Sequence, residues 1–468
     1  MGRGSLRHAS AAMPSQDGPS ASGAFEPIQM FEVELGRPLG AAAVRDGAGE
    51  RRYRRSRALV RLHTQPLGLV DFHGDTTTMD ATEYARGIWE ALGPSIVRHL
   101  QRDGLKTVTE LGAAGLPWPV HPPCVAQREA LLAAAPPVSV VVCTRDRPDR
   151  VATCLRSLVA VEYPSFEVVV VDNAPSSSAT ADYIRATYGS DRRVRYVRED
   201  RRGVVWARNC GLMASEGEIV AYADDDVLVD RYWLVELVKG FQVADRVACV
   251  TGLVLPAELE TQAQAWFEEY GGFAKGFDQR AYDMRQNRPK TPLYPYTAGK
   301  FGSTNSTAFS TSILRDVGGF DKALCVAGAE DISTYFQLIM DGYTLVYEPN
   351  SIVYHYHRRE YSALKRQMYW YGIGLTAYLT KCLVDRPKDV PHFLARLPMG
   401  LIYMFGARSP KNVKKSHMYP RELTNLEIQG TLVGPFAYLQ GRWRARKLAR
   451  LGDPRRSSQT LPRGPVPQ

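Results

Sequence analysis

The sequence predicts an α/β fold with a mostly parallel sheet at its centre. Two runs rich in β-branched residues, VSVVVC at 138–143 and FEVVVVD at 166–172, are typical of strands buried on both faces. Between them, apolar residues at helical spacing in 147–161 predict a helix. A strand, a helix and a second parallel strand form a right-handed βαβ unit, and the same alternation continues to about residue 226.

The part before this sheet predicts a separate, smaller unit. Residues 1–25 are rich in Ser, Ala and Gly and are expected to be a disordered N-terminus. Residues 26–115 predict a small α+β unit, with two strands within 57–72 around a turn at Gln65-Pro66-Leu67-Gly68. A helix or two should follow within 79–104, with Asp80 as N-cap, and the proline-punctuated segment 116–137 is expected to be a linker.

The catalytic α/β domain is expected to span 138–361. Its second half should contain a strand at 247–256, a helix at 331–343 ended by Gly342, and two strands within 344–357 around Glu348-Pro349-Asn350.

Helical patterns return in 362–450, and 451–468 reads as a basic disordered tail. Within the helical region the apolar segment 393–406 is too short to span a membrane, because Arg396 and Pro398 interrupt it. We expect it to be a buried helix rather than an interfacial one.

Composition narrows the class of protein. The chain has 468 residues, 44% hydrophobic content and a formal net charge of +10, which favours anionic partners. Its seven cysteines include no C-x-x-C pair, which argues against a disulfide framework and against a structural zinc site. Neither a secretory signal nor a membrane-spanning run is apparent, so a cytoplasmic location is expected.

Three adjacent acidic residues, Asp224, Asp225 and Asp226, follow the apolar run 219–223 directly. Carboxylates about 5 Å apart repel by roughly 3 kcal/mol per pair at an effective dielectric near 20. Either water disperses this repulsion on a surface loop or a cation relieves it, and a D-x-D pair of oxygens suits Mg²⁺ or Mn²⁺. Ligands of open α/β sheets bind beyond the carboxyl ends of the strands, where this cluster is expected to lie.

Further polar side chains fall at the same predicted edge. They follow the first strand (Thr144, Arg145 and Arg147), end the second strand (Asp172) or belong to the helix that precedes the aspartates (Arg208 and Asn209). Such groups can contact a diphosphate, a ribose or a base. A charged residue after a strand is usually only a solvated loop residue, so their common position carries the argument.

Four segments, in order and spacing, resemble family 2 glycosyltransferases with the GT-A fold: VSVVVCTRDRP, EVVVVDNAPSS, GVVWARNCGLMASEGEIVAYADDD and GGFDKALCVAGAEDISTYFQLIMDGY. The resemblance covers about 138–360, half of the chain. It implies an inverting transferase of hexosyl type that uses a nucleotide sugar and a divalent cation, Mn²⁺ or Mg²⁺.

The resemblance also implies roles for single residues. Asp226, Asp224 and His355 would hold the metal, with His357 as the alternative histidine. Nucleotide-sugar contacts would come from Thr144, Arg147, Asp172, Arg208, Asn209, Asp224, Asp225, Gly302 and Asn305. Asp331 would be the catalytic base, and Glu330 would be second or would place the acceptor. Both acids could instead merely favour the N-terminus of a helix.

The predicted function is therefore metal-dependent, inverting transfer of a sugar from a UDP-, GDP- or dTDP-sugar to an acceptor hydroxyl that the sequence does not identify. One alternative is a nucleotidyltransferase on a related scaffold. Such an enzyme needs a glycine-rich, phosphate-binding loop after the first strand, and the segment that follows this strand contains no glycine. Another is a basic module binding nucleic acid or a membrane surface. We expect no nucleic-acid partner, but peripheral contact with the inner face of a membrane through the C-terminal region.

Overall fold

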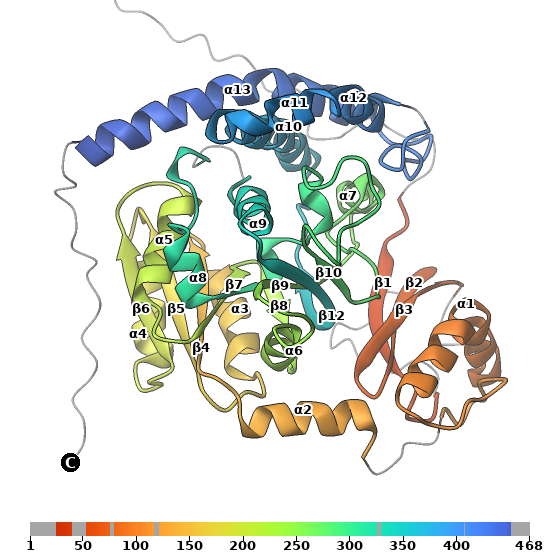
Figure 1. Cartoon of the computed structure of the whole chain (residues 1–468). Coiled ribbons are helices and arrows are strands. Elements are labelled where there is room, and N and C mark those ends of the chain that lie inside the picture. Colours follow the sequence, from red (N-terminus) through yellow and green to blue (C-terminus); the bar gives the residue numbers. More distant parts are fainter. Residues whose placement is uncertain are drawn as a thin grey trace, which may run out of the picture.

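The computed structural model describes residues 25–39, 53–74, 79–116, 121–324, 329–406 and 408–450. The predicted basic tail and all but one residue of the predicted disordered N-terminus lie outside the described residues. In Figure 1 a central sheet carries helices on both faces, the N-terminal unit lies beside it, and the C-terminal helices run along its upper edge.

The N-terminal unit is a three-stranded sheet covered by a helix. Its elements are β1 (Ile28–Glu34), β2 (Arg55–Leu62), β3 (Gln65–His73) and α1 (Ala81–Arg102). β1 runs parallel to β2, whereas β2 and β3 form an antiparallel hairpin. The N-cap prediction is confirmed, because Asp80 accepts a hydrogen bond from the Thr82 N–H.

The hairpin turn lies earlier than the sequence predicted. Pro66 and Gly68 are paired within β3, opposite Arg61 and Val60. The turn is formed instead by His63 and Thr64, both with positive φ, which matches the twist of tightly connected strands. The expected linker also contains a helix, α2 (Pro123–Ala133), which begins at a proline, where the missing N–H costs least.

The predicted α/β sheet is confirmed, but it is mixed rather than mostly parallel: of the pairings between its described strands, four are parallel and four are antiparallel. Its strand order is β10-β12-β9-β11-β7-β4-β5-β6, with β8 paired to β12. The strands are β4 (Val138–Thr144), β5 (Phe166–Asn173), β6 (Val194–Glu199), β7 (Ile219–Asp224), β8 (Val227–Val229), β9 (Val247–Pro256), β10 (Arg280–Tyr282), β11 (Thr307–Ser310) and β12 (Thr344–His355). β11 is antiparallel to both of its neighbours, β7 and β9.

Two apolar layers enclose this sheet. Val140 and Val142 of β4 pack with α3 and α6 on one face, whereas Val141 packs with α5 and α9 on the other. The helices are α3 (Pro148–Val159), α4 (Ala179–Tyr188), α5 (Val204–Ala214), α6 (Trp233–Gly240), α7 (Gln262–Tyr270), α8 (Thr311–Asp316) and α9 (Glu330–Met340).

β12 corrects a second prediction, because it is one strand and not two. It pairs with β9 from Thr344 to Glu348 and again from Ile352 to His355. A register shift between these two stretches accommodates the Pro349-Asn350 segment, so the strand continues past the residues that looked like a turn.

The expected helical C-terminal region is confirmed. It comprises α10 (Tyr361–Asp385), α11 (Val390–Leu394), α12 (Leu397–Phe405) and α13 (Arg421–Arg450). α10 and α13 pack closely because Gly430 and Gly434 lack side chains. A Cβ at either glycine would lie 2.1 Å or less from an atom of α10. Among the described residues, no helix is long and apolar enough to cross a membrane.

The expectation of a buried helix in 393–406 is wrong. No residue of α12 is buried, and Leu401 and Ile402 are 48% and 67% exposed. A strongly apolar sequence does not reveal whether a neighbouring element covers it, and here none does on the outer side.

Arg61 of β2 links the N-terminal sheet to the α/β domain. Its guanidinium, 7% exposed, donates hydrogen bonds of 2.8 Å to Asp230 and 2.9 Å to Glu32 and to the Tyr354 hydroxyl. Leu59 of the same strand packs against Leu253 and Ile352. The two units therefore share both an ion-pair network and an apolar contact.

We predict that Arg61→Met destabilises the chain by about 3–5 kcal/mol, because it leaves Asp230, whose side chain is only 11% exposed, without its cation. The matched control is Arg57→Met on the same strand, whose partner Asp71 is 44% exposed, and this should cost about 0–1 kcal/mol. Urea unfolding followed by tryptophan fluorescence measures both. Equal losses of stability in the two variants would contradict the buried link.

Candidate active site

Strand register gathers the predicted polar residues at one edge of the sheet. Thr144 at the end of β4 lies beside Asp172 at the end of β5, and Cys143 lies beside Asp224 at the end of β7. These strands are parallel, so their carboxyl ends meet at the same edge, as expected for an α/β ligand site.

Asp225 is held by residues that follow β4. Its carboxylate is buried and accepts hydrogen bonds from the Thr144 hydroxyl at 2.7 Å and from the Arg147 guanidinium at 3.2 Å. Burial and the neighbouring Asp226 raise the pKa of Asp225 to about 6. The Asp225 side chain therefore fixes the strand ends to one another.

Asp226 is surrounded by cationic and imidazole groups. His355 Nε2 lies 3.3 Å from Oδ1, and the guanidinium groups of Arg147 and Arg358 lie 3.8 and 3.7 Å from Oδ2. Burial opposes ionisation, but these three side chains outweigh it and hold the pKa of Asp226 below its usual range. Both arginines keep more than two-fifths of their side-chain surface exposed.

A chain of hydrogen bonds orients His355. Its Nδ1 lies 2.9 Å from His357 Nδ1, and His357 Nε2 lies 2.8 Å from Glu268 of α7. Phe267 and Phe273 pack against these imidazoles. Of the two candidate histidines, His355 faces the aspartate, whereas His357 supports it from behind.

Arg208 joins the aspartate cluster to the first turn of α9. It is buried and pairs with the Glu330 carboxylate and, at 3.4 Å, with Asp224 Oδ1. The structure therefore places Asp224 toward Arg208, whereas Asp226 lies toward His355. Arg208 itself contacts carboxylates, although the sequence predicted it as a nucleotide contact.

Asp331 follows Glu330 but has no basic partner of its own among the described residues. The Asp331 carboxylate accepts hydrogen bonds from the backbone N–H of Ile332 at 2.7 Å and from the Thr304 hydroxyl at 3.5 Å. Burial and the adjacent Glu330 charge raise the pKa of Asp331 to about 6. Both acids do lie in the first turn of α9, where the helix dipole favours them.

Two further predicted residues lie at the same edge in different environments. Asp172 is fully buried and accepts a hydrogen bond from the Tyr196 hydroxyl at 3.1 Å, while its Oδ1 has no partner among the described residues. Burial raises the pKa of Asp172. The Asn209 amide instead bonds both the N–H and the C=O of Phe320, so it holds a backbone segment.

Gly302 and Asn305 lie just before β11. Gly302 has a φ of +119°, and a Cβ there would lie 2.5 Å from the Thr251 side chain, so the position requires glycine. Asn305 is buried and accepts a hydrogen bond from the Ser303 hydroxyl, but its Nδ2 has no partner among the described residues.

Some residues of this site were not singled out from the sequence. Arg358, Glu268 and Thr304 contact Asp226, His357 and Asp331 respectively. Arg358 could have been found, since it directly follows the two histidines after a strand. Lys275 was not singled out either. Burial lowers the pKa of its ammonium group to about 8, and the charges of Glu268 and Asp331 act on it in the opposite direction. No local pattern marks it.

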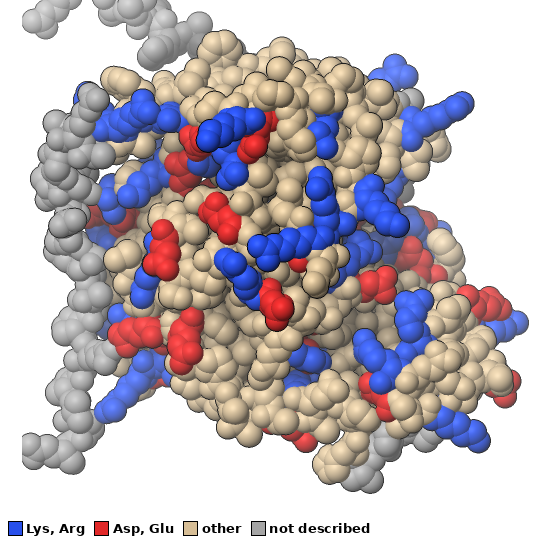
Figure 2. Space-filling view, viewed as in Figure 1, with Lys and Arg blue, Asp and Glu red and all other residues tan. Residues whose placement is uncertain are grey.

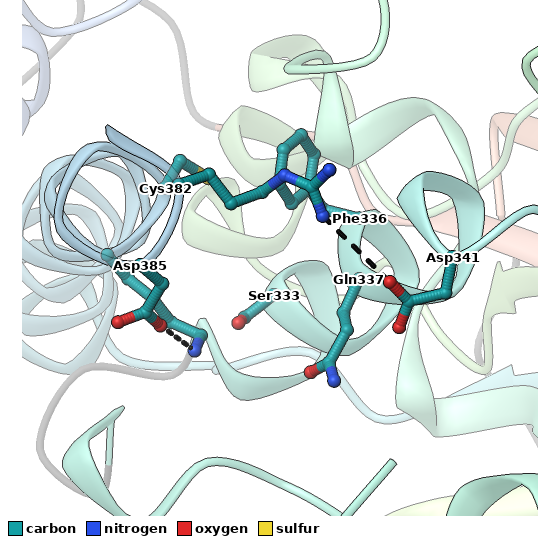
Figure 3. A pocket seen from close by; sticks show the side chains of 8 residues that line it. Ser333, Phe336, Gln337, Asp341, Cys382 and Asp385 are labelled. Atoms are coloured by element: carbon teal, nitrogen blue, oxygen red, sulfur yellow. Dashed lines mark hydrogen bonds and ion pairs between the residues drawn. The ribbon is translucent and has the colours of Figure 1, made fainter. Parts of the chain in front are cut away.

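A separate hollow between α9 and α10 contains none of these residues (Figure 3). Ser333, Phe336 and Gln337 line it on one side, and Cys382 on the other. Its charged side chains are paired at the rim, Lys381 with Asp385 and Arg386 with Asp341. It offers no group prepared for chemistry comparable to the aspartate edge.

Residues 139–316 match the family model described as glycosyl transferase family 2. This segment, which is less than half of the chain, is therefore similar to that family. The match spans β4 to α8 and includes the aspartates and their partners on β4, and the predicted glycosyltransferase class is thereby confirmed. This favours the transferase over both a nucleotidyltransferase and a binding module without activity.

The chain is also similar to individual known proteins. The chain is 24% identical over 323 residues to a glucosyl-dolichyl phosphate glucuronosyltransferase of Haloferax volcanii, covering 60% of this chain and 99% of that protein. It is 27% identical over 226 residues to a pre-mycofactocin glycosyltransferase of Mycobacterium tuberculosis, of which it spans 43%. A solved mannosyltransferase of Pyrobaculum calidifontis, in complex with GDP-Man and Mn²⁺, is 22% identical over 68% of this chain and 76% of its own, with a TM-score of 0.39.

Proposed function

We propose that this glycosyltransferase moves a sugar from a nucleoside diphosphate sugar to an acceptor hydroxyl with inversion at the anomeric carbon. UDP-, GDP- and dTDP-sugars are the candidate donors. The observation that carries the proposal is the division of labour between two adjacent carboxylates: Arg208 neutralises Glu330, whereas Asp331 has no cationic partner among the described residues.

This division suits Asp331 to act as the base. A pKa of about 6 leaves most of the carboxylate ionised at pH 7 while making it a stronger base than an ordinary aspartate. In inverting transfer the acceptor oxygen attacks the face opposite the leaving diphosphate, and its proton must pass to a base on that face. Asp331 would accept this proton on a carboxylate oxygen, and Thr304 orients that carboxylate.

The nucleotide would lie at the ends of β4 and β5. Arg147 and Arg358 are half-exposed beside the same carboxylate and can bind the oxygens of a diphosphate. Asp172, whose buried Oδ1 has no hydrogen-bond partner among the described residues, could accept a hydrogen bond from a base or ribose once the site opens to it. Thr144 and Asp225 support this region, and Gly302 and Asn305 are placed to line the donor sugar. In this proposal Arg208 and Asn209 position the site without touching nucleotide.

The side chains around Asp226 fit a divalent cation. A carboxylate oxygen and an imidazole nitrogen lie 3.3 Å apart, and a pair with a nitrogen ligand suits Mn²⁺ better than Mg²⁺, which prefers oxygen. Asp224, one-third exposed, is the third candidate ligand, although it lies toward Arg208. When bound, the cation would neutralise negative charge on the departing diphosphate.

We expect Mn²⁺ to strengthen binding of one nucleoside diphosphate among UDP, GDP and dTDP, and Asp226→Asn to remove most of this enhancement. The variant loses half of the proposed carboxylate–imidazole pair, whereas the control Asp149→Asn changes an exposed acid on α3. Isothermal titration with and without Mn²⁺ measures the effect. Equal binding with Mn²⁺ and with EDTA would contradict the metal assignment.

We expect Asp331→Asn to lower kcat by about 10²–10⁴-fold, because general-base catalysis contributes about that factor, with little change in nucleotide affinity. The matched control is Asp341→Asn at the other end of α9, which should turn over normally. Release of nucleoside diphosphate in the presence of acceptor gives the rate. Normal turnover by Asp331→Asn would refute the role of the base.

We further propose that the exposed C-terminal helices dock on an anionic membrane surface, consistent with peripheral location at its inner face. One apolar stripe runs along α13 at a spacing of three or four residues, and α12 adds a second group. Their exposed members are Leu397, Met399, Leu401, Ile402, Phe405, Leu432, Phe436, Leu439 and Trp443.

Basic side chains accompany this apolar surface. Arg408 and Lys414 follow α12, and Arg444, Arg446 and Lys447 are exposed near the end of α13. Figure 2 shows Lys and Arg near both ends of a largely uncharged upper surface, in the part of the molecule where Figure 1 places α12 and α13. Apolar groups flanked by cations are the pattern of interfacial helices on anionic lipid. The Haloferax relative is named for glucosyl-dolichyl phosphate, and a lipid-linked acceptor would suit this arrangement.

We expect the chain to sediment with vesicles of phosphatidylcholine and phosphatidylglycerol, and the double variant Ile402→Ser/Phe436→Ser to bind at least tenfold more weakly. Each replaced side chain contributes about 1.5–3 kcal/mol when fully buried. Met213→Ser on α5 is the control, since Met213 is 74% exposed away from this surface. Unchanged binding by the double variant, or a chain that only self-associates, would overturn the proposal.

A further inference from the structure

A cluster of metal-ligand side chains lies inside the N-terminal unit, separate from the aspartate edge. It consists of His63, His99, Asp103 and Cys124, all buried, whose ligand atoms lie within 4.8 Å of one another. The residues come from three segments: the turn between β2 and β3, the end of α1 and the first turn of α2. Neither the family match nor the proposed transfer reaction involves any of them.

The spacing of these atoms matches a tetrahedral zinc site. Zinc bonds of about 2.0–2.3 Å in tetrahedral geometry separate two nitrogen or oxygen ligands by about 3.3 Å, and a nitrogen from a sulfur by about 3.6 Å. Here His99 Nε2 lies 3.1 Å from His63 Nδ1. Asp103 Oδ2 lies 3.3 Å from His63 Nδ1 and 3.4 Å from His99 Nε2. Cys124 Sγ lies 3.7 Å from His63 Nδ1 and 4.0 Å from His99 Nε2.

The electrostatic balance also fits a divalent ion. One thiolate and one carboxylate carry two negative charges, and two neutral imidazoles carry none, so Zn²⁺ would make the site neutral. Neutrality matters because an unbalanced charge in a buried position is strongly unfavourable. All four side chains are less than 8% exposed, which leaves no evident open position for a substrate and favours a structural ion.

Backbone strain at the turn is a second observation. His63 and Thr64 both have positive φ, 54° and 69°, although turns of this kind usually contain Asn or Gly. Thr64 is β-branched, for which this conformation is unusual. Such strain persists only where the surroundings impose it, and this backbone conformation brings His63 into the cluster. Arg128 of α2 further holds the turn through a 2.7 Å hydrogen bond to the Thr64 hydroxyl.

We propose that His63, His99, Asp103 and Cys124 bind a structural Zn²⁺ that fastens α2 to the N-terminal unit. α2 in turn contacts the α/β domain, because Arg128 pairs with Glu236 of α6 at 3.5 Å and stacks on Tyr232. The ion would therefore fix the connection between the two units. Of the six cysteines that the structure describes, only Cys124 takes part, which is why the lack of a C-x-x-C pair gave no indication of this site.

Metal binding changes the protons in this cluster. The Cys124 thiol loses its proton to solvent as the Zn–S bond forms. Arg102 now donates to His99 Nδ1 at 3.1 Å, an arrangement that puts the imidazole proton on Nε2, inside the cluster. Zinc at Nε2 moves this proton to Nδ1, so Arg102 must release that nitrogen and keep its 2.5 Å hydrogen bond to Gln65.

The first test is the zinc content of the full chain, measured by inductively coupled plasma mass spectrometry after brief dialysis against EDTA. The background variant is Asp226→Asn, which removes the proposed catalytic ion. We expect about one zinc per chain, a fall of at least tenfold in Cys124→Ala, and no change in Cys382→Ala, another buried cysteine. No zinc in the background variant, even after incubation with zinc chloride, or equal zinc in both cysteine variants, would overturn the proposal.

A second measurement needs no destabilising substitution. The full chain, stripped under denaturing conditions and refolded with Co²⁺, should show the near-ultraviolet charge-transfer band of a cobalt–thiolate bond and the visible bands of tetrahedral cobalt. Zinc should abolish these bands at one equivalent. Octahedral cobalt spectra without the thiolate band would overturn the assignment while leaving the proposed transfer reaction untouched, since that reaction depends on other residues.

Discussion

The buried guanidinium of Arg208 is the interaction on which the arrangement of the active site depends. It lies between Asp224 at the end of β7 and Glu330 at the start of α9, two carboxylates more than a hundred residues apart in the chain. A buried cation between two carboxylates offsets repulsion that would otherwise push the sheet edge and the helix apart. Asp331, next to Glu330, has no ion-pair partner of its own among the described residues, and burial and the adjacent Glu330 charge raise its pKa.

Cations also surround Asp226, but these are partly exposed, unlike the buried Arg208. Arg147 and Arg358 reach this carboxylate but remain partly exposed, so a bound diphosphate could attract them without breaking a buried pair. His355 is more firmly placed, because its other ring nitrogen contacts His357, which Glu268 holds in turn, and Phe273 packs against its ring. The edge thus combines rigid supports with adjustable cations, as a site that binds and releases a charged substrate requires.

Three regions outside the sheet differ in how they contact the rest of the chain. The N-terminal unit is attached through Arg61 and Leu59, and α2 extends that attachment to α6. α10 and α13 approach closely through glycines. α12 and the outer face of α13 remain uncovered. An enzyme whose acceptor is linked to a lipid would need an uncovered apolar surface. In the N-terminal unit, the proposed Zn²⁺ bound by His63, His99, Asp103 and Cys124 would make the packing rigid.

Much of the fold was predictable because it rests on local patterns. Continuous β-branched runs and helical spacing marked β4, α3 and β5, and the Asp80 cap was found from one residue and its neighbours. The family motifs marked the aspartates and the Glu330-Asp331 pair by their order along the chain. Turn residues misled at Pro66 and Pro349, because both residues are compatible with a strand when its partner tolerates a bulge.

The sequence by itself determined the class of fold, the family and the kinds of side chain present at the sheet edge, since periodicity and motif order are local properties. Only the tertiary structure decided which partner each side chain meets. It directed Asn209 to the Phe320 backbone and Arg208 to two carboxylates, left the 393–406 segment exposed, and brought Cys124 to His63 and His99. The physical reason is that ion pairing, burial and metal ligation depend on distances between residues remote in the chain, which are fixed only when the elements pack together.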